Sequence, residues 1–193
     1  MAILSIRIIG DPVLRETAEE VTTFGPELAK LVEDMAETMR DVRGAGLAAP
    51  QIGVNKRIFT YSVDGEEGHV INPVIVASDD FVPGEPEGCL SVPGLGYTVP
   101  RHRWVRVTGV DVNGKTIDIE ATGTLAKCFQ HETDHLNGML YVDRLEGDDR
   151  KDALRAIRMA NYHDVTAQTV AKRAHTVGSA FGTGASSGTG AAQ

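Results

Sequence analysis

The sequence is short of cysteine, tryptophan and positive charge. It has two cysteines and one tryptophan in 193 residues, and 19 lysines and arginines against 27 aspartates and glutamates. A net charge of −8 argues against a general nucleic-acid-binding surface, so we expect no DNA partner. Cys89 and Cys128 could form one disulfide, but without a secretory signal we expect a reducing compartment and two free thiols.

The sequence also lacks a long apolar run. Its first ten residues place Arg7 inside a short apolar stretch, with no basic leader and no small-residue cleavage site. We therefore expect no signal peptide, no membrane-spanning segment and a cytoplasmic location.

What is present predicts an α+β fold. Helical patterns cover residues 26–41, 123–136 and 148–159, and Asp11 caps a short helical turn. Residues rich in β-branched and aromatic side chains predict strands at 57–63, 69–77, 97–112 and 115–121, with a turn at Asn113-Gly114. Because the strands are clustered, we expect mostly antiparallel sheets packed around a central helix.

The length is sufficient for one domain and a tail. We expect a single domain over residues 1–163, including the last helix, and a separate tail over residues 164–193. The end of this tail is mostly Gly, Ala, Ser and Thr, and such a composition buries too little apolar surface to offset backbone entropy. The tail is therefore expected to be disordered.

The most informative stretch reads His-Glu-Thr-Asp-His, residues 131–135. On a helix, positions i and i+4 share a face, so His131 and His135 can bind one metal ion. Glu132 lies beside the first ligand, where it can accept a proton from a metal-activated water. Two ligands are too few for a protein metal site, so the third ligand decides the class of enzyme.

Three sources of the third ligand can be compared. A metzincin protease would continue with a Gly and a third His, but this chain has Gly138 followed by Tyr141 where that His belongs. A thermolysin-like protease would use a downstream Glu, and Glu146 leaves that weaker alternative open. Cys128 and His135 are about 10 Å apart along a helix axis, so Cys128 fits better as a core or pocket-wall residue.

Cys89 is the remaining thiol. It lies in an extended Pro- and Gly-rich segment, Pro86-Glu-Gly-Cys-Leu-Ser-Val-Pro-Gly, that can hold a thiolate against a helix. A free cysteine is most often a buried core residue. Because the two-histidine site is incomplete, we favour Cys89 as the metal ligand.

Three segments in this order resemble the signature motifs of the peptide deformylase family. They are Gly44-Ala-Gly-Leu-Ala-Ala-Pro-Gln51, Glu87-Gly-Cys-Leu-Ser91 and Gln130-His-Glu-Thr-Asp-His-Leu-Asn-Gly138. The resemblance runs from about Ile6 to Arg158. The sequence Cys-Leu-Ser-Val-Pro-Gly, from Cys89 on, is similar to that of the bacterial and organellar catalytic type. It implies a catalytic domain that removes the N-formyl group from the formyl-methionine of new polypeptides and releases formate.

The resemblance also implies residue roles. Cys89, His131 and His135 would bind the ion, and Glu132 would act as general base and acid. Gln51 and the backbone N–H of Leu90 would stabilise the oxyanion. The substrate-binding residues would be Gly44, Ala45, Gly46, Leu125 and Cys128.

The resemblance further implies a cofactor and partners. The expected ion is Fe²⁺, one per chain, with Zn²⁺, Ni²⁺ or Co²⁺ able to replace it, and the expected substrate is a formyl-Met nascent peptide. Two residues depart from the family pattern, Ala45 and Lys127, and both bear on the shape of the methionine pocket. The basic positions Lys151, Arg155 and Arg158 share one face of the last helix, where we expect a weak ribosome contact.

Two other function classes remain as alternatives. An endopeptidase could use the same His-Glu-x-x-His helix, and a binding module could use the metal as a structural ion only. Glu132 argues against the second class, because a closed structural site needs no carboxylate beside the ion.

Overall fold

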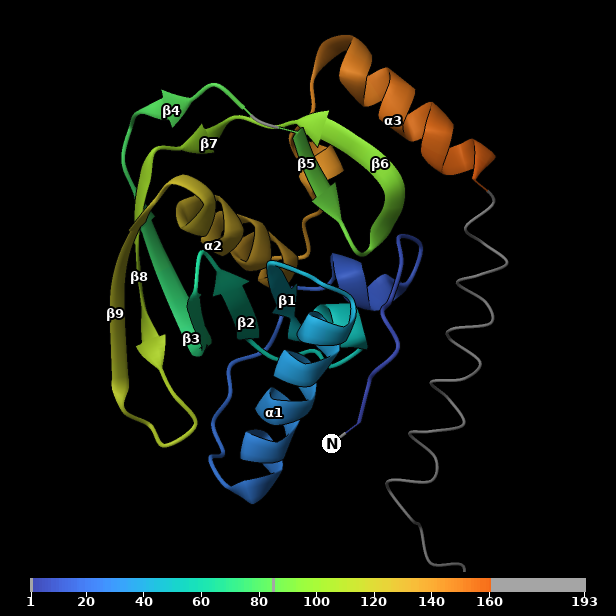
Figure 1. The fold of residues 1–193 in the computed structure, drawn as a ribbon. Helices are drawn as coiled ribbons and strands as arrows, with labels where there is room; N and C mark the ends of the chain where they lie inside the picture. The colour runs from blue at the N-terminus through green and yellow to red at the C-terminus, as the bar shows by residue number, and fades with distance from the viewer. Residues whose placement is uncertain (1, 85, 161–193) are drawn as a thin grey trace, which may run out of the picture.

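The computed structural model describes residues 2–84 and 86–160. A five-stranded antiparallel sheet in the order β1-β2-β3-β8-β9 forms one side of the molecule, and a smaller β5–β6 pair lies across α2 from it (Figure 1). The prediction of an α+β fold around a central helix is confirmed.

The bounds of the elements are as follows. The helices are η1 (Pro12–Arg15), α1 (Pro26–Asp41), η2 (Ala49–Ile52), α2 (Gly123–Leu136), η3 (Tyr141–Arg144) and α3 (Gly147–Met159). The strands are β1 (Gly46–Ala48), β2 (Ile58–Val63), β3 (Glu66–Ala77), β4 (Phe81–Val82), β5 (Pro86–Cys89), β6 (Val92–Thr98), β7 (Arg101–His102), β8 (Trp104–Val110) and β9 (Thr116–Thr122).

The first long helix follows its apolar spacing. Leu28, Val32, Met35 and Met39 recur every three or four residues on one face of α1, and all four are buried. Proline at the first helical position suits the start of the helix, where its missing N–H has no partner to lose. The expected helix over residues 26–41 is therefore confirmed, and α1 packs against the β1–β2 edge of the large sheet.

The second long helix passes through the middle of the fold. α2 contacts β1, β2, β8 and β9, and an aromatic cluster joins the helix to the sheet. The ring of Phe129 lies 5.6 Å from that of Phe59 and 5.0 Å from that of Tyr61, the latter pair edge-on. Such packing fixes the rotation of α2, and with it the face that its polar residues occupy.

One predicted strand is wrong. The run over residues 97–112 is divided between the end of β6, β7 and β8, and each piece pairs with a different partner. Pro100 lies at the first break, where the missing N–H of proline cannot join a strand ladder. The neighbouring predictions at 57–63, 69–77 and 115–121 correspond to β2, β3 and β9, and Gly114 has the positive φ expected in the turn before β9.

The C-terminal part has one described helix. α3 buries only Ala153, which joins an apolar cluster with Val92, Val99 and Leu140. Residues 161–163 of the expected domain and the whole expected tail, 164–193, lie outside the described residues. Among the residues that the structure describes, no helix has the length and apolar character to cross a membrane.

Candidate active site

Three ligand atoms meet at the inner end of α2. Cys89 ends β5, and its Sγ lies 3.2 Å from Nε2 of His135. Nε2 of His135 lies 3.2 Å from Nε2 of His131, one helical turn earlier. The three atoms lie within 4.8 Å of one another.

This cluster fits a divalent metal ion. Ligands bound at about 2.0–2.3 Å in a tetrahedron lie roughly 3.3–3.8 Å apart, close to the two 3.2 Å separations. Burial lowers the pKa of His135 well below its ordinary value, so its imidazole is neutral, as metal binding requires. One thiolate and two imidazoles suit Fe²⁺, Zn²⁺, Co²⁺ or Ni²⁺ better than Mg²⁺ or Ca²⁺.

A buried carboxylate orients one of the two imidazoles. Oε1 of Glu87 lies 2.6 Å from Nδ1 of His131, which leaves Nε2 of the ring for the ion. Arg101 holds the same carboxylate through two donors, and both side chains are under 5% exposed. Burial raises the pKa of Glu87, but the hydrogen bonds from His131 and Arg101 outweigh it and lower this pKa to about 2.

Glu132 lies inside the site and has little room. Its side chain is buried, and its Oε2 has no hydrogen-bond partner among the described residues. A Cβ added to Gly46 would lie 2.4 Å from Oε1 of Glu132, so a larger residue there would force the Glu132 side chain to move. Burial raises the pKa of Glu132 to about 7, near the value that suits a proton carrier at neutral pH.

Gln51 faces Cys89 from the other side of the cluster. Its Oε1 accepts a hydrogen bond from the backbone N–H of Ala48. This contact orients the amide so that Nε2 donates to Oγ of Ser91, at 3.2 Å, and approaches Sγ of Cys89, at 3.8 Å. Gln51 is buried, so its amide is a fixed donor near the cluster.

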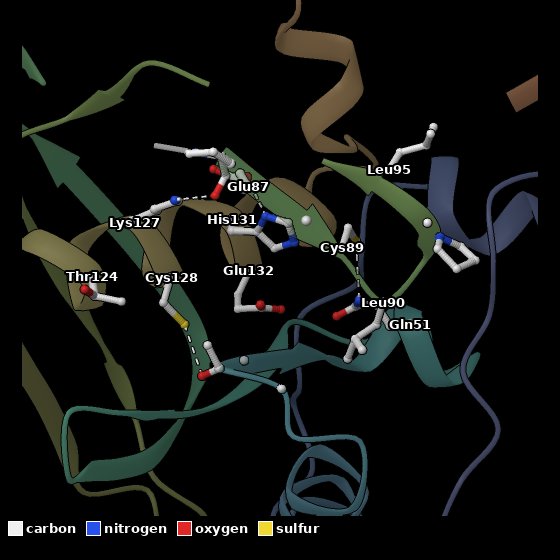
Figure 2. Close-up of a pocket in the computed structure, with 17 residues that line it drawn as sticks. Gln51, Glu87, Cys89, Leu90, Leu95, Thr124, Lys127, Cys128, His131 and Glu132 are labelled. Carbon is white, nitrogen blue, oxygen red and sulfur yellow. Dashed lines mark hydrogen bonds and ion pairs between the residues drawn. The ribbon is translucent and has the colours of Figure 1, made fainter. Parts of the chain in front are cut away.

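The cluster opens into a cavity of about 580 Å³ (Figure 2). The segment Gly44, Ala45 and Gly46 lines one side, and the β5 segment up to Leu90 lines the other. Thr124, Lys127 and Cys128 form the wall along α2, where Sγ of Cys128 donates to the carbonyl of Ala45 and Nζ of Lys127 donates to that of Pro86.

Leu125 does not line this cavity. It packs against the core cluster that contains Phe129, its neighbour one turn later on the same helix face. Thr124 takes the position in the wall instead, three and seven residues before Lys127 and His131. Leu125 is therefore a core residue, because its side chain lies on the face of α2 that packs against the sheet.

Sequence reasoning missed several residues around the site. Pro93, Gly94 and Leu95 line the cavity from the β6 side; the first two end the segment quoted around Cys89 but were given no role, and Leu95 lies beyond it. Tyr141 is buried with its ring stacked on that of His131, at a centroid distance of 6.4 Å. The only sequence signal for Tyr141 was that it stands where a metzincin has a histidine.

The fold and the cluster together define the class of metal-dependent hydrolases. Two histidines one turn apart on a helix offer two imidazole nitrogens, a cysteine from a strand offers the third ligand atom, and a buried carboxylate lies beside them in a peptide-sized cavity. Such a site can activate water and move a proton.

Comparison with known proteins specifies the family. Residues 3–151 match the model of the polypeptide deformylases. The chain is 49% identical over 164 residues to a peptide deformylase from Parafrankia sp., covering 84% of this chain and 89% of the relative, and 50% identical over 162 residues to one from Acidothermus cellulolyticus, with the same coverage. The crystal structure of a peptide deformylase from Legionella pneumophila has a TM-score of 0.78 and 42% identity, covering 85% of this chain and 98% of that one.

The chain belongs to the polypeptide deformylase family. It is a metal-dependent hydrolase that removes the N-formyl group from newly synthesised polypeptides. The recognition made from three short motifs is thereby confirmed.

Proposed function

We propose a role for each residue of the site in this reaction. Cys89, His131 and His135 hold one divalent ion, and Glu132 carries the proton. Gln51 and the backbone N–H of Leu90 donate hydrogen bonds to the oxyanion. The observation that supports this assignment most strongly is the three-ligand cluster beside a buried, unpartnered carboxylate oxygen of Glu132.

The proton path follows from where Glu132 lies. An ion held by the three ligands would lower the pKa of a water molecule and polarise the formyl carbonyl. Glu132 accepts the proton of the attacking water and delivers it to the amine nitrogen as the C–N bond breaks, a role worth about 10²–10⁴ in rate. Gln51 stabilises the charge on the formyl oxygen, where one such donor is worth about 10²–10³.

We further propose Fe²⁺ as the resident ion, one per chain, with Zn²⁺, Ni²⁺ or Co²⁺ able to replace it. The thiolate of Cys89 and two imidazoles accept all four ions, so availability in the cell decides the occupant. Anaerobic purification followed by metal analysis tests this proposal. One equivalent of iron per chain supports it, and one equivalent of zinc with no iron under the same conditions contradicts it.

Two unpaired strand edges suit an extended peptide. Among the strands that the structure describes, β1 is an edge strand of the large sheet and β5 pairs only with β6, so each has one edge without a neighbouring strand beside the cavity. We propose that the formyl-peptide adds as a strand between them. Its first side chain then lies in the wall formed by Ala45, Thr124, Lys127 and Cys128.

The activity has a direct test. Formyl-Met-Ala-Ser should release formate, and a chelator should abolish the release until Fe²⁺ is added back anaerobically. A blocked peptide that only an endopeptidase can cut should remain intact. Internal cleavage without formate release would favour the endopeptidase alternative and overturn the proposed roles.

We also propose a weak contact between α3 and the ribosome, because nascent chains carry their formyl group there. A cytoplasmic location follows from this proposal. Lys151, Arg155 and Arg158 are exposed, although Lys151 pairs with Asp148 and Arg155 with Asp152. These pairs offset part of the positive charge, so the contact is expected to be weak. Because it would be made with RNA phosphates, it is also expected to be salt-sensitive. Reversal of the three charges should reduce co-sedimentation with ribosomes at low salt, and unchanged co-sedimentation would contradict this proposal.

A further inference from the structure

A chain of ion pairs runs from the metal ligand His131 to the surface. Glu87 bonds His131, and Arg101 holds Glu87 through Nε and Nη2, at 3.0 and 2.5 Å. Nη1 of Arg101 then donates to Oδ2 of Asp134, at 2.7 Å. Glu87, Arg101 and Asp134 have side chains no more than 6% exposed, so this part of the chain is shielded from water.

Arg144 of η3 ends the chain. Its Nε and Nη2 donate to the two oxygens of Asp134, at 2.6 and 2.5 Å, in a planar two-point contact. Unlike the three inner members, Arg144 has a side chain that is 39% exposed. Asp134 therefore has one partner that reaches the site and one that reaches solvent.

We propose that Arg144 is a positioning residue for the metal ligand His131, acting through Asp134, Arg101 and Glu87. Its two donors fix the plane of the Asp134 carboxylate, so that Oδ2 faces Arg101. Arg101 in turn holds Glu87 against Nδ1 of His131, which sets the direction of Nε2. This inference rests on the proposed role of His131 as a ligand.

Geometry and net charge predict opposite effects of removing Arg144. Loss of a positive charge near a cation site strengthens cation binding by simple attraction. Loss of the two-point contact lets Asp134 rotate, which loosens the chain and weakens binding. Lysine keeps the charge but lacks the planar fork, so Arg144→Lys and Arg144→Gln separate the two effects.

The test is the rate at which the Zn²⁺-loaded full chain loses its ion to excess chelator. Direct partners of metal ligands change metal affinity by about 10- to 100-fold, and for this more remote residue we expect Zn²⁺ loss to be about 3- to 10-fold faster. Both Arg144→Lys and Arg144→Gln should show it. Arg106→Lys is the matched control, because Arg106 holds Asp118 with the same two donors on the exposed sheet face, and it should lose Zn²⁺ at the wild-type rate.

Each outcome decides the question. Faster loss in both Arg144 variants supports positioning when Arg106→Lys loses Zn²⁺ at the wild-type rate and the metal-free Arg144 variants melt no lower than metal-free Arg106→Lys. Wild-type loss rates in both variants, or a wild-type rate in Arg144→Lys with slower loss in Arg144→Gln, overturn it. A wild-type chain that binds no Zn²⁺ contradicts the proposed ligand set itself, and that failure is visible before any variant is measured.

Discussion

Two helices of similar length, α2 and α3, use charge in opposite ways. In α2, with 14 residues, Glu132, Asp134 and His135 are buried and have specific roles in the site or in the ion-pair chain behind it. In α3, with 13 residues, only Ala153 is buried, and Lys151 and Arg155 pair with aspartates three residues earlier in solvent. The comparison shows that charged residues of a helix take on catalytic or structural roles where they are buried and held by fixed hydrogen-bonding partners.

The largest expected difference is in stability. Arg101→Met leaves Glu87 with His131 as its remaining partner and Asp134 with Arg144, and breaking such a buried pair costs about 3–5 kcal/mol. The free energy of unfolding from urea titration measures this loss. The matched change in α3, Arg155→Met, removes an exposed pair and should leave the titration midpoint unchanged. Equal losses in the two variants would remove the distinction between the helices.

The next effect is on catalysis. In Gly46→Ala the new Cβ would meet Glu132 at 2.4 Å, which forces the carboxylate from its position. A displacement of about 1 Å at a reacting group can cost on the order of 10²-fold in rate, so kcat for formyl-Met-Ala-Ser should fall by about that factor. Gly25→Ala is the control, because a Cβ there meets nothing within 4 Å. A normal kcat in Gly46→Ala would mean that Glu132 need not lie where it does.

A smaller effect concerns substrate binding. Lys127 places a charged side chain in the cavity wall, with Nζ on the carbonyl of Pro86. Lys127→Leu adds apolar surface for the methionine side chain, so KM should fall by about fivefold, or roughly 1 kcal/mol, while kcat stays constant. Lys151→Leu on α3 should leave both constants unchanged. A higher KM in Lys127→Leu would show that the cation itself assists binding.

The smallest effect is expected in α3. Reversal of Lys151, Arg155 and Arg158 to glutamate should leave kcat and KM for the short formyl-peptide unchanged, because all three side chains are solvated and none lines the cavity. Steady-state formate release at low and high salt measures this. A change of kcat at low salt that disappears at high salt would indicate that the electrostatic potential of the α3 charges extends to the active site.

Local patterns predicted much of the fold, but not where strands change partners. The apolar spacing of α1 and the bounds of α2 could be predicted from residues alone. The strand expected over residues 97–112 was wrong because each of its three pieces pairs with a different segment. β1 could not be predicted, because a strand of three residues that begins with Gly46 has no alternation of apolar and polar side chains. It is defined by its pairing with β2.

The site was predictable where its residues form motifs. Cys89, His131 and His135 come together as three short segments suggested, and Glu132 lies beside them. Leu125 was expected in the pocket, yet its helix face meets the sheet, and this depends on how α2 is rotated in the core. Arg144 reaches Asp134 ten residues away through a turn after α2, and no pattern in the sequence marks that contact.

The central claim is that α2 and Cys89 hold one catalytic ion beside a proton-carrying glutamate. Metal content and formate release, measured in the same anaerobic sample of Glu132→Gln and of the wild-type chain, test it most directly. We predict one ion per chain in both proteins and a loss of formate release of about 10²–10⁴ in the variant. Normal formate release in Glu132→Gln with its metal retained would contradict the claim.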